Sequence, residues 1–317
     1  MNAQPTTPIP TGRSSVADNA PAGLSVAASQ VSHRYGQTQA LQEVSFELGA
    51  GRIHGLLGRN GAGKTTLLSL IGSMLRPTSG EITVGGRRPF EDEEVMQQIC
   101  LVRESGDVVT DEKVSVTLDA HEALRSGFDR ARAEAILAEF AVPTKRRPGA
   151  LSRGQQSAIG IAIGLASRAP LTIFDEAQLG LDAPSRQRFY DLLLEDFAES
   201  GRTIILSTHL ISEVEHLLDT VTILDRGSVL LSGEADDLRG HGLSIIGPDQ
   251  AVSAATRGLT VVGDRSLGPT RQVTVFDPQI ERLVPDFEAA GLTVAAVPLQ
   301  DLFIHLTGQH PTQEQVS

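Results

Sequence analysis

The sequence is short of cysteine, aromatic residues and long hydrophobic runs. It has one cysteine, Cys100, among 317 residues, which excludes an internal disulfide framework and suits a reducing compartment. Trp is absent and aromatic residues are scarce, while aliphatic residues are plentiful, a balance that favours an α/β protein. The most apolar stretch, 158–166, is much shorter than the roughly 20 residues of a membrane-spanning helix. The chain is therefore not expected to cross a membrane itself.

The charge and length narrow the class of protein further. A formal net charge of -12 repels phosphate backbones, so no nucleic-acid partner is expected. The length exceeds the roughly 250 residues that one core usually supports, which predicts one large and one small domain. Residues 1–23 are rich in Pro, Thr, Ser, Ala and Gly, without the apolar centre of a signal peptide. This segment is predicted to be a disordered leader, and the polar residues 309–317 a disordered tail.

A phosphate-binding loop is predicted from the segment "GLLGRNGAGKTTLLSL", residues 55–70. It has the pattern GxxxxGK(S/T), between an apolar strand and an amphipathic helix. Glycines let the backbone N–H groups turn inward at a helix N-terminus, where the helix dipole also favours an anion. Lys64 is expected to reach the β and γ phosphates of a nucleotide, Thr65 to ligate Mg²⁺, and Thr66 to reach the α phosphate. The predicted phosphate-binding set is Gly58, Asn60, Gly61, Ala62, Gly63, Lys64, Thr65 and Thr66.

A second acidic motif is expected where a phosphate loop is present, because Mg²⁺ needs a further ligand. The stretch "PLTIFDE" has an apolar run that ends in Asp175 and Glu176. Ligands gather at the carboxyl ends of parallel strands, so Asp175 is predicted to bind the metal. Glu176 is the candidate general base for water. The alternative is a solvated strand end that happens to carry two acids.

The segment "LSRGQQS", residues 151–157, resembles the LSGGQ signature of ATP-binding cassette (ABC) ATPases, about twenty residues before Asp175. Ser152 is predicted to cap a helix, which offers an anion a hydroxyl, backbone N–H groups and the helix dipole. In this family the anion is the γ-phosphate bound to the opposite protomer. The resemblance therefore implies a homodimer in which Ser152, Gly154 and Gln155 contact the partner's ATP.

Three further stretches resemble the cassette and occur in its order. "EAQLGLD" resembles the D-loop and places Asp182 at its end, although Ala177, Gln178 and Leu179 replace the usual residues. "TIILSTH" resembles the strand that ends in the H-switch, which implies that His209 contacts the γ-phosphate. Tyr35 lies upstream of the phosphate loop, where cassettes keep an aromatic residue that stacks on adenine. A buried core tyrosine is the alternative for Tyr35, and a local hydrogen-bonding residue is the alternative for His209.

Two positions depart from the family's pattern. The Q-loop glutamine should follow the strand "ICLV", but Gln97 and Gln98 precede this strand and Glu104 stands in register. A carboxylate can still ligate Mg²⁺, while it adds negative charge beside the triphosphate. Altered metal dependence is therefore expected rather than inactivity. In the signature, Arg153 replaces a glycine, and function is expected to survive this change.

The predicted fold class is α/β, a P-loop NTPase with an ABC-type nucleotide-binding domain over residues 24–239. Its helical subdomain is expected at about 104–165, where apolar residues recur three and four apart. Residues 240–308 read as strand, helix, strand, strand, helix, strand, an order typical of a small α+β domain of ferredoxin-like fold. Their ending, "VPLQDLFIHLTG", resembles that of ATPase subunits of ABC-2-type exporters.

The resemblance implies the ATP-hydrolysing subunit of a bacterial ABC exporter, with ATP and Mg²⁺ as cofactors. Its expected partners are a second copy and a separately encoded transmembrane permease, and its expected place is the cytoplasmic face of the cell membrane. Two alternatives remain open. One is a soluble ABC ATPase without a transport role, and the other is a slow nucleotide-gated interaction module. The transported substrate is not encoded in these motifs.

Overall fold

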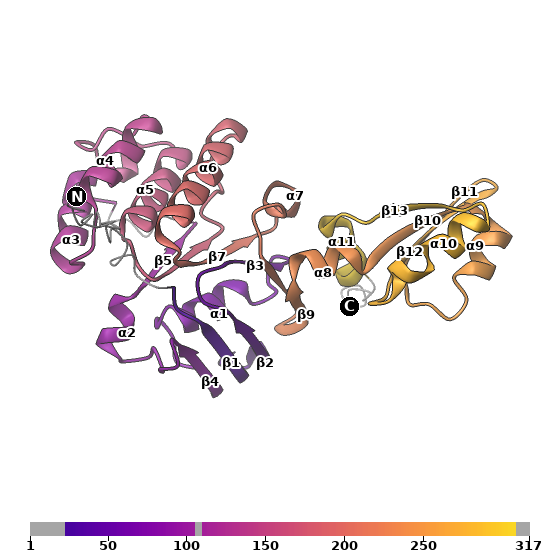
Figure 1. Cartoon of the computed structure of the whole chain (residues 1–317). Coiled ribbons are helices and arrows are strands. Elements are labelled where there is room, and N and C mark those ends of the chain that lie inside the picture. Colours follow the sequence, from indigo (N-terminus) through magenta and orange to yellow (C-terminus); the bar gives the residue numbers. More distant parts are fainter. Residues whose placement is uncertain (1–22, 105–109, 309–317) are drawn as a thin grey trace, which may run out of the picture.

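A computed structural model describes residues 23–104 and 110–308 of the chain (Figure 1). The predicted leader, apart from Gly23, and the predicted tail lie outside the described residues. A six-stranded sheet forms the centre, in the order β5-β6-β7-β3-β8-β9, parallel except for the antiparallel edge strand β9. Its strands are β3 (Ile53–Gly58), β5 (Ile99–Arg103), β6 (Leu171–Asp175), β7 (Thr203–Thr208), β8 (Thr220–Asp225) and β9 (Ser228–Glu234). Cys100 is a buried residue of β5.

A three-stranded antiparallel sheet covers one face of the central sheet. It comprises β1 (Val26–Tyr35), β2 (Thr38–Leu48) and β4 (Ser79–Val84). Helix α1 (Lys64–Ile71) packs between the two sheets, because its leucines join one apolar cluster with residues of both. The short helix α2 (Glu93–Gln97) precedes β5. This packing fixes α1, and with it the loop that precedes α1.

Helices form the layer on the other face. They are α3 (Val114–Leu124), α4 (Arg130–Glu139), a 3-10 turn (Pro148–Ala150), α5 (Arg153–Ala166) and α6 (Ala183–Ser200). The most apolar stretch of the sequence lies in α5 and is buried from Ser157 to Ala166, so it is a core helix. Within the described ranges, no helix combines the length and apolar character that crossing a bilayer requires.

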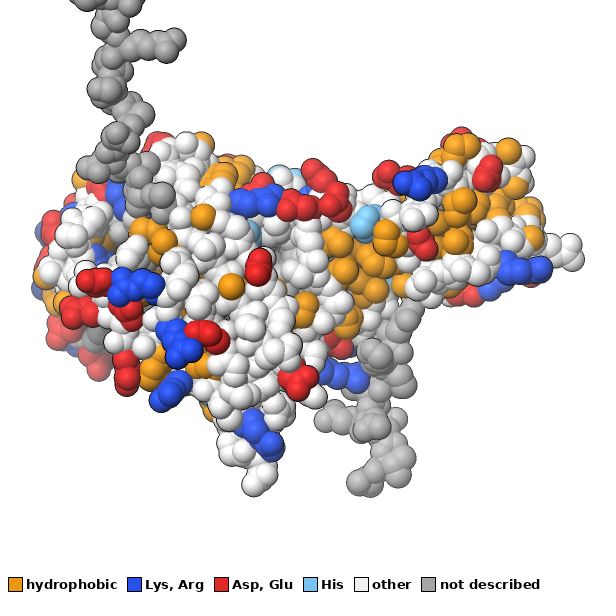
Figure 2. Space-filling model, turned by 60° about the horizontal axis from the view of Figure 1, so that its bottom comes forward, with side chains coloured by type: hydrophobic (Ala, Val, Ile, Leu, Met, Phe, Trp, Pro, Cys, Tyr) orange, Lys and Arg blue, Asp and Glu red, His pale blue; other side chains and the backbone are white. Residues whose placement is uncertain are grey.

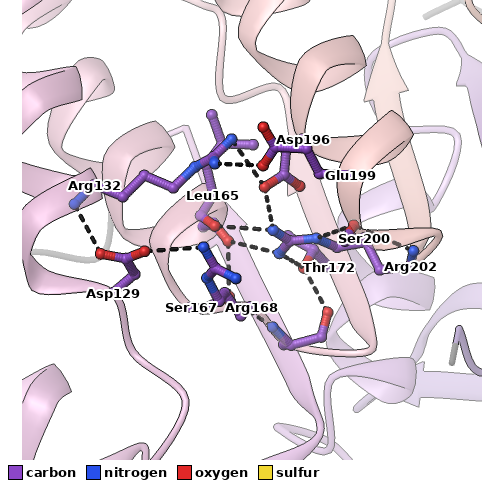
Figure 3. Close-up of polar contacts among 12 residues, drawn as sticks. Asp129, Arg132, Leu165, Ser167, Arg168, Thr172, Asp196, Glu199, Ser200 and Arg202 are labelled. Carbon is purple, nitrogen blue, oxygen red and sulfur yellow. Dashed lines mark hydrogen bonds and ion pairs between the residues drawn. The ribbon is translucent and has the colours of Figure 1, made fainter. Parts of the chain in front are cut away.

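A buried charged network joins the helical layer to the central sheet (Figure 3). Arg202, at 1% exposure, pairs with the buried Asp196 of α6 and donates to the Leu165 carbonyl oxygen at 2.9 Å. Arg132 of α4 lies 3.2 Å from the same Asp196 carboxylate. Burial raises the pKa of Asp196 and lowers that of Arg202, because each charged form loses hydration. The network connects α4, α5, α6 and the start of β7.

Replacing Asp196 by asparagine is expected to destabilise the protein strongly. The variant keeps the side-chain volume but leaves two guanidinium groups without their shared carboxylate, which costs about 3 kcal/mol or more for a buried pair. Urea denaturation measures the change. Glu195→Ala is the control, since Glu195 is an exposed neighbour on the same helix and surface changes alter stability by about 0.5 kcal/mol or less. Equal losses in the two variants would show that the network contributes no special stability.

The C-terminal residues form a second unit with its own core. Its antiparallel sheet has the order β11-β12-β10-β13, and its strands are β10 (Gly242–Pro248), β11 (Val261–Leu267), β12 (Thr270–Phe276) and β13 (Thr293–Ala296). The helices are α9 (Asp249–Ala255), a 3-10 turn (Ile280–Leu283) and α10 (Val284–Ala289). Helix α8 (Ala235–Gly240) leads into this unit. Figure 2 shows it projecting from the larger body, over which acidic and basic side chains are interspersed.

The last described helix, α11 (Leu299–Gly308), returns to the larger unit (Figure 1). Its residues Leu299, Leu302 and Phe303 belong to the main apolar core of the molecule, beside the short helix α7 (Ile211–Val214). The core of the second unit consists of other residues, from β10, β12, α9 and α10. Helix α11 therefore connects the two units.

Candidate nucleotide site

The predicted phosphate loop lies between β3 and α1, and the strand, loop and helix order is confirmed. Two glycines explain why the loop can turn here. Gly61 has φ 81° and Gly63 has φ 103°, in the left-handed region that glycine adopts without strain. A Cβ atom on Gly63 would also lie 2.8 Å from the Ala40 carbonyl oxygen. Since the first amides of a helix have no intrahelical acceptor, the start of α1 is open to an anion.

Lys64 is the buried cation of this loop. Its side chain is only 7% exposed, its Nζ donates to the Gly58 carbonyl oxygen at 2.7 Å, and it lies 3.4 Å from Glu176 Oε1. Asp175 and Glu176 stand at the carboxyl end of β6, as the sequence predicts. Glu176 has φ 53°, a strained value for a residue with a side chain. In this backbone conformation the Glu176 carboxylate lies beside the Lys64 ammonium group.

Glu176 also contacts the residue after β7. Its Oε2 lies 3.0 Å from His209 Nδ1, so the structure brings together Lys64, Glu176 and His209. The fully buried Gln178 completes the cluster: its amide nitrogen donates to Thr208 Oγ1 at 2.7 Å and lies 3.4 Å from Glu176 Oε2. Sequence reasoning missed Gln178, which it noted only as a replacement of a usual D-loop residue. The signal that could have indicated it was a long polar side chain only two residues after the candidate base Glu176.

A cavity of about 520 Å³ adjoins these carboxylates and could hold a hydrated cation. It is lined by Thr65, Asp175, Glu176 and Glu104, among others. Asp175 Oδ1 is buried and has no hydrogen-bond partner among the described residues. No cluster of three or more His, Cys, Asp or Glu residues suited to a metal occurs in the described ranges. The donors present fit Mg²⁺, which binds one or two carboxylates and takes its other ligands from water and phosphate.

Glu104 directly follows β5, at the position that the sequence predicts for the Q-loop residue. Strand β5 pairs with β6 so that Arg103 stands opposite Asp175, and Glu104 follows directly. Its side chain is exposed and borders the same cavity as Thr65. Gln97 and Gln98 lie at the opposite end of β5, beyond reach of this cavity along the strand.

Four residues of the signature and D-loop segments line a cavity of their own. Ser152 caps α5 as predicted, and it forms a reciprocal cap with Gln155. The Gln155 N–H donates to Ser152 Oγ and the Ser152 N–H donates to Gln155 Oε1, both at 3.2 Å. Ser152, Gly154, Gln155 and Asp182 line a cavity of about 360 Å³, and Asp182 caps α6. None of these four lines the cavity shared by Thr65 and Asp175. Arg153, Gln156 and Ser157 of the same segment do line the Thr65 cavity, so the start of α5 borders both cavities.

Tyr35 ends β1 and is 51% exposed, so it is not a core residue. Its ring meets His33 edge to face, with centroids 4.7 Å apart. The exposed tyrosine ring remains available to a planar ligand. Stacking between two aromatic rings contributes on the order of 1 kcal/mol to binding.

Thr65 is exposed and Thr66 is half-buried in the first turn of α1.

These features define a P-loop nucleotide-binding protein. Residues 41–178 match the ABC transporter family. The linearmycin resistance ATP-binding protein LnrL of Bacillus subtilis is 30% identical over 315 residues, covering 89% of this chain and 98% of LnrL. The methionine import ATP-binding protein MetN of Cupriavidus metallidurans is 32% identical over 213 residues, covering 64% of this chain and 62% of MetN. A solved ATP-binding subunit of an ABC transporter has a TM-score of 0.61 at 27% identity, covering 68% of this chain and 92% of that one.

The chain belongs to the ABC transporter family, as an ATP-binding subunit with ATPase activity. The resemblance seen in the motifs is thereby confirmed, together with the P-loop fold.

Proposed function

We propose that this chain is the ATP-hydrolysing subunit of an ABC exporter and acts as a homodimer on a separately encoded permease. The observation that carries the proposal is the cluster of Lys64, Glu176 and His209 beside the phosphate loop, with the orphaned Asp175 oxygen in the adjoining cavity. A cation, a base and a histidine gathered at the ends of parallel strands suit the positioning of water against a triphosphate.

Each residue of the cluster has a role in this proposal. The loop amides and Lys64 bind the phosphates, and Thr65 and Asp175 hold Mg²⁺, with Glu104 at the edge of the same cavity. Mg²⁺ supplies charge neutralisation between the phosphates. Glu176 orients and deprotonates water, His209 contacts the γ-phosphate, and the exposed ring of Tyr35 receives adenine. Gln178 fixes the Glu176 carboxylate by contacting it from the buried side.

The signature residues are proposed to act on the ATP of the second copy. Ser152, Gly154, Gln155 and Asp182 line a cavity to which no phosphate-loop residue of their own chain contributes. A capped helix N-terminus suits an anion. Two copies placed head to tail would set this group against the partner's γ-phosphate, so that ATP closes the dimer and hydrolysis reopens it.

The direction of transport is proposed from the extent of the similarity. The resistance protein LnrL aligns with 89% of this chain, whereas the import protein MetN aligns with 64%. The alignment with LnrL therefore extends beyond residues 24–239, the proposed nucleotide-binding domain. Because the longer similarity is to a resistance protein, we propose export rather than import. Within the predicted range 240–308, we assign the elements from β10 to β13 as a ferredoxin-like domain, on the basis of their strand and helix order and the sheet order β11-β12-β10-β13.

Glu104→Gln, which restores the family's usual side chain, is expected to change the metal dependence of hydrolysis. The exposed carboxylate attracts Mg²⁺ weakly, so the Mg²⁺ concentration for half-maximal turnover should rise about two- to fivefold, as for a surface charge pair. ATPase assays at varied Mg²⁺ measure this. The control is Glu112→Gln, an exposed glutamate in the segment after Glu104. An unchanged Mg²⁺ response in Glu104→Gln would make Glu104 an ordinary loop residue.

The experiment that tests the function is coexpression with a candidate permease, a protein rich in membrane spans that is sought in the adjacent reading frame. The exporter proposal predicts that the two form a complex at the cytoplasmic face of the membrane, and that vesicles of the complex move substrate only with ATP. A chain that hydrolyses ATP but remains apart from every membrane fraction would favour the soluble ABC ATPase. A chain that binds ATP with negligible turnover would favour the nucleotide-gated interaction module.

A further inference from the structure

Helix α11 is joined to α7 by two reciprocal caps. The Leu299 N–H at the start of α11 donates to Glu215 Oε2 at 3.1 Å, just after α7 ends. In return, the Ser212 N–H in the first turn of α7 donates to Gln300 Oε1 at 3.2 Å. Helix α7 has four residues, too few to be stable alone, so contacts from outside must hold it. Gln300 supplies one such contact, and apolar packing of Leu299 and Leu302 supplies others.

Helix α7 begins two residues after His209. The intervening Leu210 N–H donates to Thr208 Oγ1 at 3.0 Å, the same hydroxyl that accepts from Gln178. His209 in turn lies against Glu176. The backbone that carries His209 is thus held between the end of β7 and the first turn of α7. A shift of α7 would move His209 relative to Glu176.

Helix α11 also reaches the phosphate loop and the second unit. Phe303 and Thr307 line a cavity of about 520 Å³ together with His209 and the loop residues 58–62. On the other side, His305 Nε2 lies 3.4 Å from Thr274 Oγ1 of β12. A Cβ atom on Gly263 of β11 would meet the His305 ring, which shows how closely α11 approaches this sheet. One helix therefore contacts both the C-terminal sheet and the His209 region.

We propose that Gln300 is a positioning residue for ATP hydrolysis, which holds α7 and thereby keeps His209 against Glu176. The C-terminal unit is then coupled to the hydrolysis site through α11, and a change in that unit alters turnover rather than ATP binding. The inference rests on the proposed role of Glu176 and His209.

The test compares three variants of the full chain in steady-state Mg-ATP hydrolysis. Gln300→Leu removes the acceptor for the Ser212 amide, so kcat should fall about tenfold while KM for ATP stays within about twofold, because misplacement acts on the chemical step. Gln300→Glu keeps an oxygen in place and should recover most of the rate. Asp301→Asn is the control, since Asp301 is the exposed neighbour in the same turn.

Two results would overturn the inference. One is a wild-type kcat in a folded Gln300→Leu protein, and the other is an equal loss of rate in Gln300→Glu, since that variant retains the acceptor. Should Gln300→Leu lose helical signal in circular dichroism, Gln300→Ala decides the question by the same criteria. Absence of turnover in the unmodified chain would instead refute the proposed function, so the two failures are distinguishable.

Discussion

Glu176→Gln should bind Mg-ATP, close into a dimer and hydrolyse almost nothing. The amide keeps the size of the side chain and its position beside His209, where Glu176 Oε2 now lies 3.0 Å from Nδ1. It cannot accept a proton from water, and loss of a general base typically reduces the rate about 10²- to 10⁴-fold. Loss of a negative charge 3.4 Å from Lys64 should also leave ATP binding intact or strengthen it. Single-turnover hydrolysis and size-exclusion chromatography with ATP measure the two effects.

The matched control is Glu47→Gln, which makes the same change on the exposed face of β2. It should retain full turnover. Ordinary turnover in Glu176→Gln would refute the assignment of this carboxylate as the base. Loss of ATP binding in Glu176→Gln would mean that the carboxylate holds the site together instead.

Lys64→Met should weaken ATP binding by about 30-fold or more. The methionine fills the volume of the lysine stem but leaves the phosphates without the buried cation, and truncating one partner of a buried charge pair costs about 2 to 5 kcal/mol. The neighbouring Glu176 carboxylate, which is 12% exposed at its side chain, also loses its cation and adds repulsion toward a triphosphate. Equilibrium titration with a fluorescent ATP analogue measures the affinity.

Lys145→Met is the control, because Lys145 is exposed in the helical layer. Its affinity for ATP should equal that of the unmodified chain. Similar ATP affinities for the unmodified chain, Lys64→Met and Lys145→Met would show that Lys64 does not reach the phosphates. A double variant, Lys64→Met with Glu176→Gln, should recover part of the lost affinity, since it removes the repulsion as well.

The local elements around the nucleotide could be predicted from the sequence because their causes are local. Gly61 and Gly63 adopt backbone conformations that glycine alone adopts freely, and an apolar strand before them and amphipathic helix after them fix the order. Ser152 and Gln155 are three residues apart, the spacing of a reciprocal helix cap. In such segments a few neighbouring residues determine the geometry, so pattern and structure agree.

Contacts between residues far apart in the sequence could not be predicted from local patterns. Gln178 contacts Thr208 only because β6 and β7 are adjacent in the sheet, and no pattern in either segment records that pairing. Arg202 finds Asp196 in the interior, although both residue types read as surface charges in the sequence. The sequence pattern assigns residues 299–308 to the small domain, whereas the apolar face of α11 lies in the core of the large unit.

The most direct test of the central claim mixes two inactive variants. Glu176→Gln has an intact signature, and Ser152→Arg has an intact phosphate loop but a signature blocked by a bulky cation. If each site combines the phosphate loop of one copy with Ser152 of the other, a mixed dimer contains one complete site. When equal amounts are mixed, about one quarter of the unmodified activity should return, because about half of all dimers then contain one copy of each variant and each of these has one working site of two. Activity that stays at the sum of the two variants alone would contradict the shared site and the dimer built on it.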